Sequence, residues 1–484
     1  MEKRDALTVI NQDVSSSALK TLCLANHVQS VVILSTHRIF PNEKEAYLQV
    51  GADVRIITFS DLLTEEDMMR CDQTAENILH ADGGCVNKAA YASRFMSLSL
   101  IEKNRIVHQK LLSAYQFDKV FYSPGLGVAE SYWKKIEFSH CIPAHNHHTG
   151  NPFTKALQIG LKPFQSVLKI ARKIFLPAQA TIVHFDGKMY IFLSSVKRLR
   201  IRQDIHVYED NIFLTKPNRK NIYCMSIHGY DPTLAGQFKE VLIFVDGYHP
   251  SNYPRSYIDS YGKNSVFVVR TMIDQRWFAA YGKETAKPPA FLDTELFSPC
   301  MAYPRKKVLI ALNHAGDWTS LINRSDTDEL VIAAAEMARN LPHVIFRIRT
   351  HPTMNHPAHE GPNSSARIEQ FVQSCGLANL RTSSESLQED LEWSDICLSE
   401  YSQVLLDAMR NGKVGVAVNL TRRHSFMQDY ANLGFFHAND VRSAIILLRN
   451  IAEDPDSTSR THNLAVEQYN TLLHQWLDRD HGLQ

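Results

Sequence analysis

Two short polar segments in the C-terminal half of the chain carry side chains that can bind a phosphate. The first is His351-Pro352, which directly follows an apolar run typical of a β-strand. Proline holds the preceding residue in an extended conformation, so we expect the imidazole of His351 to project from the sheet edge and donate a hydrogen bond. Arg347 and Arg349 alternate on the same run and are predicted to point to one face, beside a phosphate. A turn with two solvated arginines is the alternative.

The second segment is Ser399-Glu400-Tyr401-Ser402, which ends the next predicted strand and opens a helix. Ser399 or Ser402 can cap that helix, and the free N–H groups of a helix N-terminus bind anions. A plain cap accounts for one serine only. Ligands of parallel sheets bind beyond the carboxyl ends of the strands, so the two segments are predicted to share one site.

Two aspartates also follow predicted strands. Asp317 lies in the segment Gly316-Asp317-Trp318-Thr319-Ser320, after the strand expected at 307–312, and Asp246 follows the strand expected at 241–245. A carboxylate in such a place can act as a nucleophile or as an acid or base. The alternatives are that Asp317 belongs to a helix-capping segment and that Asp246-Gly247 is only a turn.

The elements that must position these residues are those of an α/β protein. Short apolar runs rich in β-branched residues alternate with segments of helical period, as in parallel sheets covered by helices. A Pro-rich stretch at 287–305 predicts a domain boundary near residue 300. Residues 1–300 are predicted to form a Rossmann-like domain with a hairpin-rich insertion near 180–230. Residues 301–484 are predicted to form a second Rossmann-like domain that ends in helices.

Length, charge and cysteine usage exclude several classes of protein. The 484 residues exceed what one hydrophobic core usually organises, and 52 Lys and Arg against 51 Asp and Glu leave a net charge of +1. That balance argues against nucleic acid as a partner. The eight cysteines are dispersed without a C-x-x-C pair, and the histidines of 145–148 have no matching ligand motif. No essential metal is therefore predicted.

No apolar stretch is long enough to span a bilayer, so we expect a cytoplasmic protein. Residues 154–176 place basic side chains among apolar ones. This pattern fits two arrangements equally: a helix lying on the inner face of the cytoplasmic membrane, or a core helix with a solvated rim.

Several of these motifs resemble those of GT-B glycosyltransferases, in which two Rossmann-like domains face each other across a cleft. The segment 395–402 looks like their donor-binding region, and Arg349-Thr350-His351-Pro352 is similar to the HP motif of enzymes that use cytidine-activated sugars. Those enzymes include bacterial sialyltransferases, Kdo transferases of capsule and lipopolysaccharide synthesis, and CDP-glycerol glycerophosphotransferases. The segment 313–320 resembles the turn that carries the proposed nucleophile of retaining β-Kdo transferases. Val245-Asp246-Gly247 matches an acidic motif of these families with the first acid replaced by valine.

The resemblance covers roughly residues 240–420 and implies a glycosyltransferase that moves an acidic sugar from its CMP-activated form to a surface-polysaccharide or lipopolysaccharide acceptor. Kdo is the sugar it favours. Asp317 is then the nucleophile of a retaining reaction and Asp246 the acid or base. No cofactor is expected, because the CMP-sugar is a co-substrate. The residues implied in donor binding are His351, Pro352, Arg349, Arg347, Ser399, Glu400, Ser402, Gly316 and Ser320.

Four alternatives stay open at this point. One is an inverting sialyltransferase with Asp246 as base, and another is a CDP-glycerol-type glycerophosphotransferase. A UDP-sugar epimerase shares the double-Rossmann architecture. The valine before Asp246 also keeps open a non-catalytic, glycosyltransferase-like scaffold.

Overall fold

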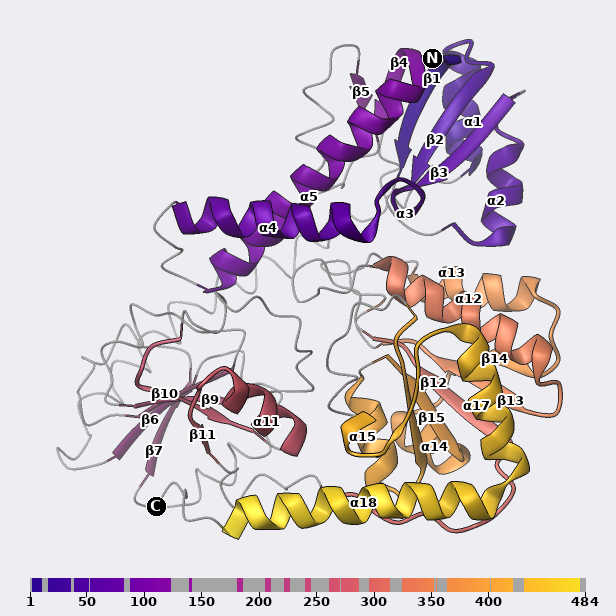
Figure 1. Cartoon of the computed structure of the whole chain (residues 1–484). Helices are drawn as coiled ribbons and strands as arrows, with labels where there is room; N and C mark the ends of the chain where they lie inside the picture. The colour runs from indigo at the N-terminus through magenta and orange to yellow at the C-terminus, as the bar shows by residue number, and fades with distance from the viewer. Residues whose placement is uncertain are drawn as a thin grey trace, which may run out of the picture.

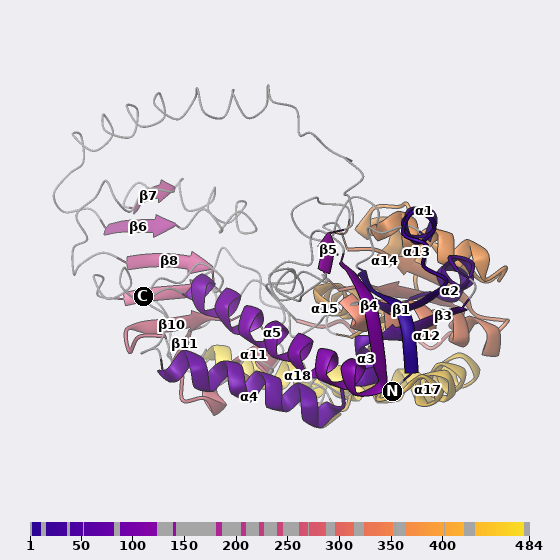
Figure 2. The same cartoon turned by 90° about the horizontal axis from the view of Figure 1, so that it is seen from above.

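The computed structural model describes most of the two ends of the chain and short pieces of its middle. Every strand pair among the described residues is parallel, and the strands form three sheets with helices packed against them (Figures 1 and 2). The predicted α/β class is confirmed. The described residues are 2–10, 16–35, 39–51, 53–81, 88–122, 139–141, 181–185, 205–209, 222–226, 240–244, 261–269, 271–286, 296–313, 324–351, 354, 364–400, 402–420 and 431–478.

The N-terminal sheet has the strand order β3-β2-β1-β4-β5. Its central strand β1 pairs with β2 on one side and β4 on the other, and its second half is fully buried. The order reverses beside β1, which is where doubly wound sheets form their ligand crevice. The elements of this region are β1 (Glu2–Ile10), α1 (Ser16–Ala25), β2 (Ser30–Ser35), α2 (Pro41–Leu48), β3 (Asp53–Thr58), α3 (Phe59–Leu62), β4 (Tyr115–Tyr122) and β5 (Ser139–Cys141).

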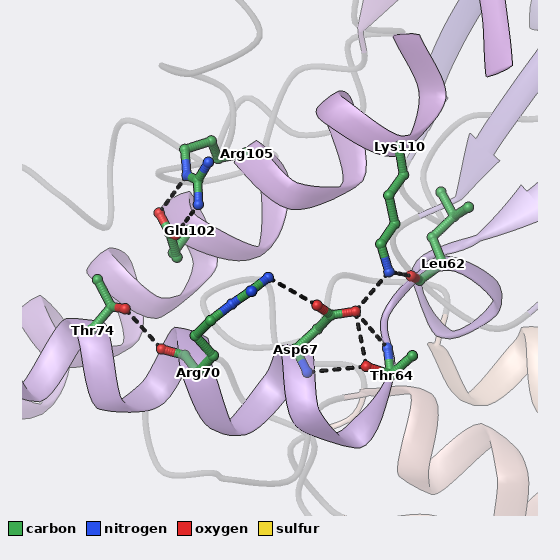
Figure 3. Close-up of polar contacts among 8 residues, drawn as sticks. All are labelled: Leu62, Thr64, Asp67, Arg70, Thr74, Glu102, Arg105 and Lys110. Carbon is green, nitrogen blue, oxygen red and sulfur yellow. Dashed lines mark hydrogen bonds and ion pairs between the residues drawn. The ribbon is translucent and has the colours of Figure 1, made fainter. Parts of the chain in front are cut away.

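Two long helices, α4 (Glu65–Ala81) and α5 (Lys88–Ala114), lie side by side and extend from the N-terminal sheet toward the middle sheet (Figure 2). Their junction with the sheet is held by Asp67, shown in Figure 3. One oxygen of Asp67 accepts hydrogen bonds from the Nζ of Lys110 at 2.6 Å and from the backbone and hydroxyl of Thr64 at 3.0 and 2.9 Å. Lys110 also donates to the carbonyl of Leu62 at 2.6 Å, so it ties α5 to the start of α4.

The middle sheet has the order β11-β10-β9-β8-β6-β7. Near 180–230, where the sequence predicted a hairpin-rich insertion, the described strand β6 pairs in parallel with β7 and with β8. The described part of residues 1–300 holds two sheets, and the domain bounds given above stay a prediction. The elements are β6 (Thr181–Phe185), β7 (Ile205–Glu209), β8 (Ile222–Ser226), β9 (Glu240–Phe244), β10 (Ser265–Val268), α11 (Met272–Ala280) and β11 (Thr285–Ala286).

The C-terminal sheet has the order β14-β13-β12-β15-β16-β17, which is the Rossmann order when its strands are numbered from β12. The strand predicted at 307–312, the one predicted before His351 and the one predicted to end at Ser399 are confirmed as β12, β13 and β15. The elements are β12 (Lys307–Ala311), α12 (Arg324–Asn340), β13 (Ile345–Arg349), α13 (Ser364–Ser374), β14 (Leu380–Thr382), α14 (Leu387–Trp393), β15 (Ile396–Ser399), α15 (Gln403–Arg410), β16 (Val414–Val418), β17 (Phe436–Ala438), α17 (Val441–Glu453) and α18 (Pro455–Asp478).

Helix α18 joins the C-terminal sheet to the middle sheet (Figure 1). The hydroxyl of Tyr469 accepts a hydrogen bond from the backbone N–H of Met272 at 3.4 Å, at the start of α11. The ring of Tyr469 stacks on Phe297 with centroids 4.1 Å apart. One hydrophobic core therefore contains side chains of both sheets and of α18. In the part of the chain that the structure describes, no helix is long and apolar enough to cross a membrane.

Candidate functional site

The carboxyl ends of β12 and β15 meet where the strand order of the C-terminal sheet reverses. Ser399, the last residue of β15, is fully buried, and its hydroxyl donates a hydrogen bond to the carbonyl of Ala311 at 2.7 Å. The same hydroxyl lies 3.5 Å from the side-chain oxygen of Asn313, just beyond β12. Ser399 thus links the two strand ends on which a ligand of this sheet would lie.

Ser402 caps helix α15 at this point. Its side chain accepts a hydrogen bond from the backbone N–H of Val404 at 3.3 Å, and its own N–H donates to the hydroxyl of Ser399 at 3.2 Å. Of the two serines predicted as possible caps, the structure selects Ser402. The cap uses the Ser402 oxygen as an acceptor, so its hydroxyl hydrogen stays suited to donate to an anion. Glu400, between the serines, is fully buried, which places its carboxylate inside the domain.

His351 follows β13 at the same edge of the sheet. β12 pairs with β13 on one side and with β15 on the other, so both predicted segments lie at the carboxyl ends of one sheet, as the sequence predicted. His351 is half-buried, and its carbonyl accepts a hydrogen bond from the N–H of Met354 at 2.9 Å. The side chain of Met354 is buried in the core of this domain, so its hydrogen bond ties His351 to that core.

Arg347 and Arg349 point to one face of β13, as predicted, and both bind the same carboxylate. Arg347 donates to one oxygen of Asp390 at 2.9 Å, and Arg349 donates to the other at 2.8 Å. Asp390 lies on α14 and is fully buried, and it also accepts the hydroxyl of Ser383 at 2.7 Å. The guanidinium of Arg347 further lies over the ring of Trp393, 3.9 Å from its centroid. Much of the positive charge expected beside a phosphate is therefore neutralised inside the domain.

Asp390 is the residue of this region that sequence reasoning missed. It lies 43 residues from Arg347 and 41 from Arg349, in a short helix without a recognisable motif. The only signal was an acidic residue directly before Leu391 in a helix that must pack on the sheet. This signal does not indicate which residues Asp390 binds.

The remaining predicted site residues lie outside the described residues. These are Asp317, Gly316, Ser320, Pro352 and Asp246, together with the segments 145–148 and 154–176. Asp246 comes two residues after β9 and so follows a strand of the middle sheet, whereas Asp317 belongs to the connection between β12 and α12. Among the residues that the structure does describe, no group of three or more His, Cys, Asp or Glu side chains could hold a metal ion.

No family model matches the sequence, and no curated protein matches it either. Among solved structures, the chain is similar to MnaA of S. aureus in complex with UDP, at 10% identity and a TM-score of 0.39 over 62% of this chain and 97% of that one. It is also similar to a mutant O-GlcNAc transferase of Thermobaculum terrenum, at 13% identity and a TM-score of 0.35 over 86% and 85%. The wall teichoic acid polymerase TagF with CDPG is a third, at 10% identity and a TM-score of 0.35 over 66% and 98%.

With TM-scores below 0.5, these likenesses carry no assignment of function. The strand order of the chain's own sheets is what establishes its class. The fold is α/β with Rossmann-like sheets.

Proposed function

We propose that the chain is a glycosyltransferase of the GT-B type that binds the phosphate of a nucleotide-activated sugar at the carboxyl ends of β12, β13 and β15. The observation that carries the proposal is the cap of α15 by Ser402 at the point where the strand order reverses, with His351 at the same edge. A helix N-terminus and an imidazole are suited to hold a phosphate there.

The finer proposal is a CMP-activated acidic sugar, with Kdo favoured, and a surface-polysaccharide or lipopolysaccharide acceptor. It is supported by the HP motif at His351 and by the segment 313–320. In the retaining form, the carboxylate of Asp317 attacks the anomeric carbon, and CMP leaves with the electrons of the broken carbon–oxygen bond while His351 donates to its phosphate. The acceptor hydroxyl then attacks the same carbon, loses its proton to Asp246 and displaces Asp317.

Arg347 and Arg349 receive a supporting role in this proposal. Because Asp390 binds both guanidinium groups, they fix the end of β13 from which the turn with His351 begins. Peripheral attachment to the inner face of the cytoplasmic membrane through 154–176 stays a prediction, since that segment lies outside the described residues.

Nucleotide binding tests the proposal directly. We expect CMP or CTP to bind in isothermal titration calorimetry and UDP to bind more weakly. His351→Ala should weaken CMP binding about tenfold or more, because a hydrogen bond to a charged group contributes about 1.5–3 kcal/mol. Ser402→Ala should weaken it in the same direction.

Thr271→Ala is the matched control for Ser402→Ala. Thr271 caps α11, beside the middle sheet, by accepting a hydrogen bond from the N–H of Asp274. Thr271→Ala therefore removes a comparable helix cap and leaves the proposed site unchanged. Preference for UDP over CMP would instead support the epimerase alternative. Absence of any nucleotide binding would reject the proposal and leave the scaffold alternative.

Transfer of the sugar can be measured separately from nucleotide binding. Incubation with CMP-Kdo should release CMP, and intact-mass spectrometry should show a sugar adduct that disappears in Asp317→Asn. An adduct that survives this substitution would exclude Asp317 as the nucleophile.

A further inference from the structure

One aromatic side chain of the region that carries the N-terminal sheet, called the N-terminal domain below, is buried in the core around the C-terminal sheet, called the C-terminal domain. Phe40 directly precedes α2, yet it is fully buried, and the other members of its core cluster all come from residues 300–451. Its ring stacks on Phe371 of α13, with centroids 4.4 Å apart and an interplanar angle of 22°. Full burial of such a ring contributes about 1.5–3 kcal/mol, so it anchors the two domains together.

Arg367 of α13 completes this contact. Its guanidinium lies over the ring of Phe40, 4.0 Å from the centroid, and binds both oxygens of Glu43 from α2, with Nη2 at 2.9 Å from Oε2. Nη1 also contacts both oxygens of Asp328 from α12, at 3.0 and 3.1 Å. The side chains of Arg367 and Asp328 are 11% and 3% exposed. One largely buried guanidinium therefore joins carboxylates of both domains.

The place of this contact relates it to the proposed site. Glu43 lies in the first turn of α2, after β2, and Arg367 is the fourth residue of α13, after the connection that begins at His351. Asp328 lies near the start of α12, after the connection that carries Asp317. All three helices begin beyond the carboxyl ends of strands and meet in Figure 1 where α2 approaches α12 and α13. The N-terminal ends of α2, α12 and α13, each of which follows a strand in the chain, are thus joined at Arg367.

We propose that Arg367 is a positioning residue: by binding Glu43 and Asp328 together, it makes nucleotide binding at the C-terminal sheet depend on docking of the N-terminal domain. The inference rests on the proposed function. Helices α12 and α13 pack with β12, β13 and β15 in one hydrophobic core. Displacement of either helix is therefore transmitted to the strand ends at which the nucleotide is proposed to bind. Because coupling between two equilibria is reciprocal, bound nucleotide must also stabilise the docked N-terminal domain.

Glu43→Gln is the most informative variant. It removes the charge that the N-terminal domain contributes but leaves Arg367 paired with Asp328, so the C-terminal domain keeps no buried unpaired charge. Glutamine can also still accept the N–H of Phe40, which Glu43 binds at 2.8 Å at the start of α2. Arg367→Lys serves as a second variant. It keeps the positive charge but loses the planar guanidinium that hydrogen-bonds both oxygens of a carboxylate.

Asp53→Asn offers a matched control. Arg4 lies between the carboxylates of Glu2 and Asp53 and is itself 7% exposed, but all three residues belong to the N-terminal sheet. The control thus converts a carboxylate of an arginine cluster into an amide without touching the contact between domains.

We expect Glu43→Gln and Arg367→Lys to weaken CMP binding about five- to tenfold in calorimetry, within the range of usual coupling between sites. In the unmodified protein, CMP should slow amide hydrogen exchange in α2, which belongs to the other domain. The two variants should lose this slowing, and Asp53→Asn should keep both the affinity and the slowing.

Unchanged CMP affinity and unchanged α2 exchange in Glu43→Gln would overturn the inference while CMP binding itself upheld the proposed function. Failure of CMP, CTP and UDP to bind the unmodified protein would reject the proposed function and this inference with it. Circular dichroism and thermal unfolding of each variant separate loss of folding from loss of coupling.

Discussion

The carboxylate of Asp390 is fully buried and is surrounded by hydrogen-bond donors from β13 and from the residue after β14. Removing a carboxylate from water costs several kcal/mol, and this cost is offset only where the charge is fully paired. Two guanidinium groups and the hydroxyl of Ser383 supply that pairing. The cluster therefore stabilises the edge of the C-terminal sheet as long as all its members are present.

Asp390→Asn should lower the free energy of unfolding by about 3–5 kcal/mol, because it leaves Arg347 and Arg349 without their countercharge. Urea unfolding followed by circular dichroism measures this change. Asp407→Asn is the control, since Asp407 and Arg410 lie 3.8 Å apart with partly exposed side chains, and such a pair contributes at most about 1 kcal/mol. Equal decreases in the free energy of unfolding of the two variants would contradict the stabilising role assigned to the buried cluster around Asp390.

Sequence reasoning placed single residues well where the information was local. The cap of α15 follows from serines directly before an apolar run, and the common orientation of Arg347 and Arg349 follows from strand alternation. The partner of these arginines could not be predicted in this way. Asp390 is brought to them by the packing of α14 on the sheet, which depends on the whole domain.

Asp67 fixes the start of α4 through local and long-range contacts. The hydrogen bond from Lys110, and then that from the backbone N–H of Thr64, hold the pKa of Asp67 well below its usual range. A carboxylate whose pKa is lower in the folded state stabilises the fold above its unfolded pKa of about 3.9, and this contribution is lost as the pH falls toward the folded pKa.

Asp67→Asn should therefore be less stable than the unmodified protein at pH 7, and the difference should shrink as the pH is lowered below about 4. Urea unfolding at pH 7, 5 and 3 gives the comparison. Asp118→Asn is a control, because its ion pair with Lys3 is exposed on both sides and should contribute little at any of these pH values. A difference that grows on acidification would contradict the assignment.

Regular elements were predicted most completely in the C-terminal domain, where buried strands alternate with amphipathic helices over short distances. β1 was missed because its first half, Glu2–Asp5, is charged. The structure shows why charge is tolerated there: Arg4 is buried but paired with Glu2 and Asp53. β14 and β17 were missed because three residues are too few to show a period.

The arrangement of the described strands in three sheets was the feature that the sequence predicted least. The sequence predicts a boundary near residue 300, but it does not predict that β1 to β5 and β6 to β11 form separate sheets. Strand pairing across more than 100 residues, as between Glu2 and Tyr115, has no local signature. The burial of Phe40 in another domain has none either.

Phe40→Ala should weaken the attachment of the N-terminal domain by about 3–5 kcal/mol, since it removes a fully buried ring. We expect scanning calorimetry to resolve the unfolding of the N-terminal domain from that of the rest at a lower temperature than in the unmodified protein.

Phe278→Ala is the matched control. Phe278 is also fully buried and stacks on another phenylalanine, Phe267, with centroids 4.2 Å apart, but both lie in the region of the middle sheet. Its truncation should lower stability without separating the N-terminal domain. Identical thermograms for the two variants would contradict an anchoring role for Phe40.

The central place of β1 has a consequence for synthesis on the ribosome. Its neighbour β2 emerges within about 30 residues, but its other neighbour, β4, emerges only after the helical hairpin of α4 and α5 has been translated. Until then, the backbone N–H and C=O groups on one side of β1 have no partner strand, and the hydrophobic core around β1 is incomplete. Pauses in translation before β4 has left the ribosome should thus expose the nascent chain to misassociation, whereas later pauses should be tolerated.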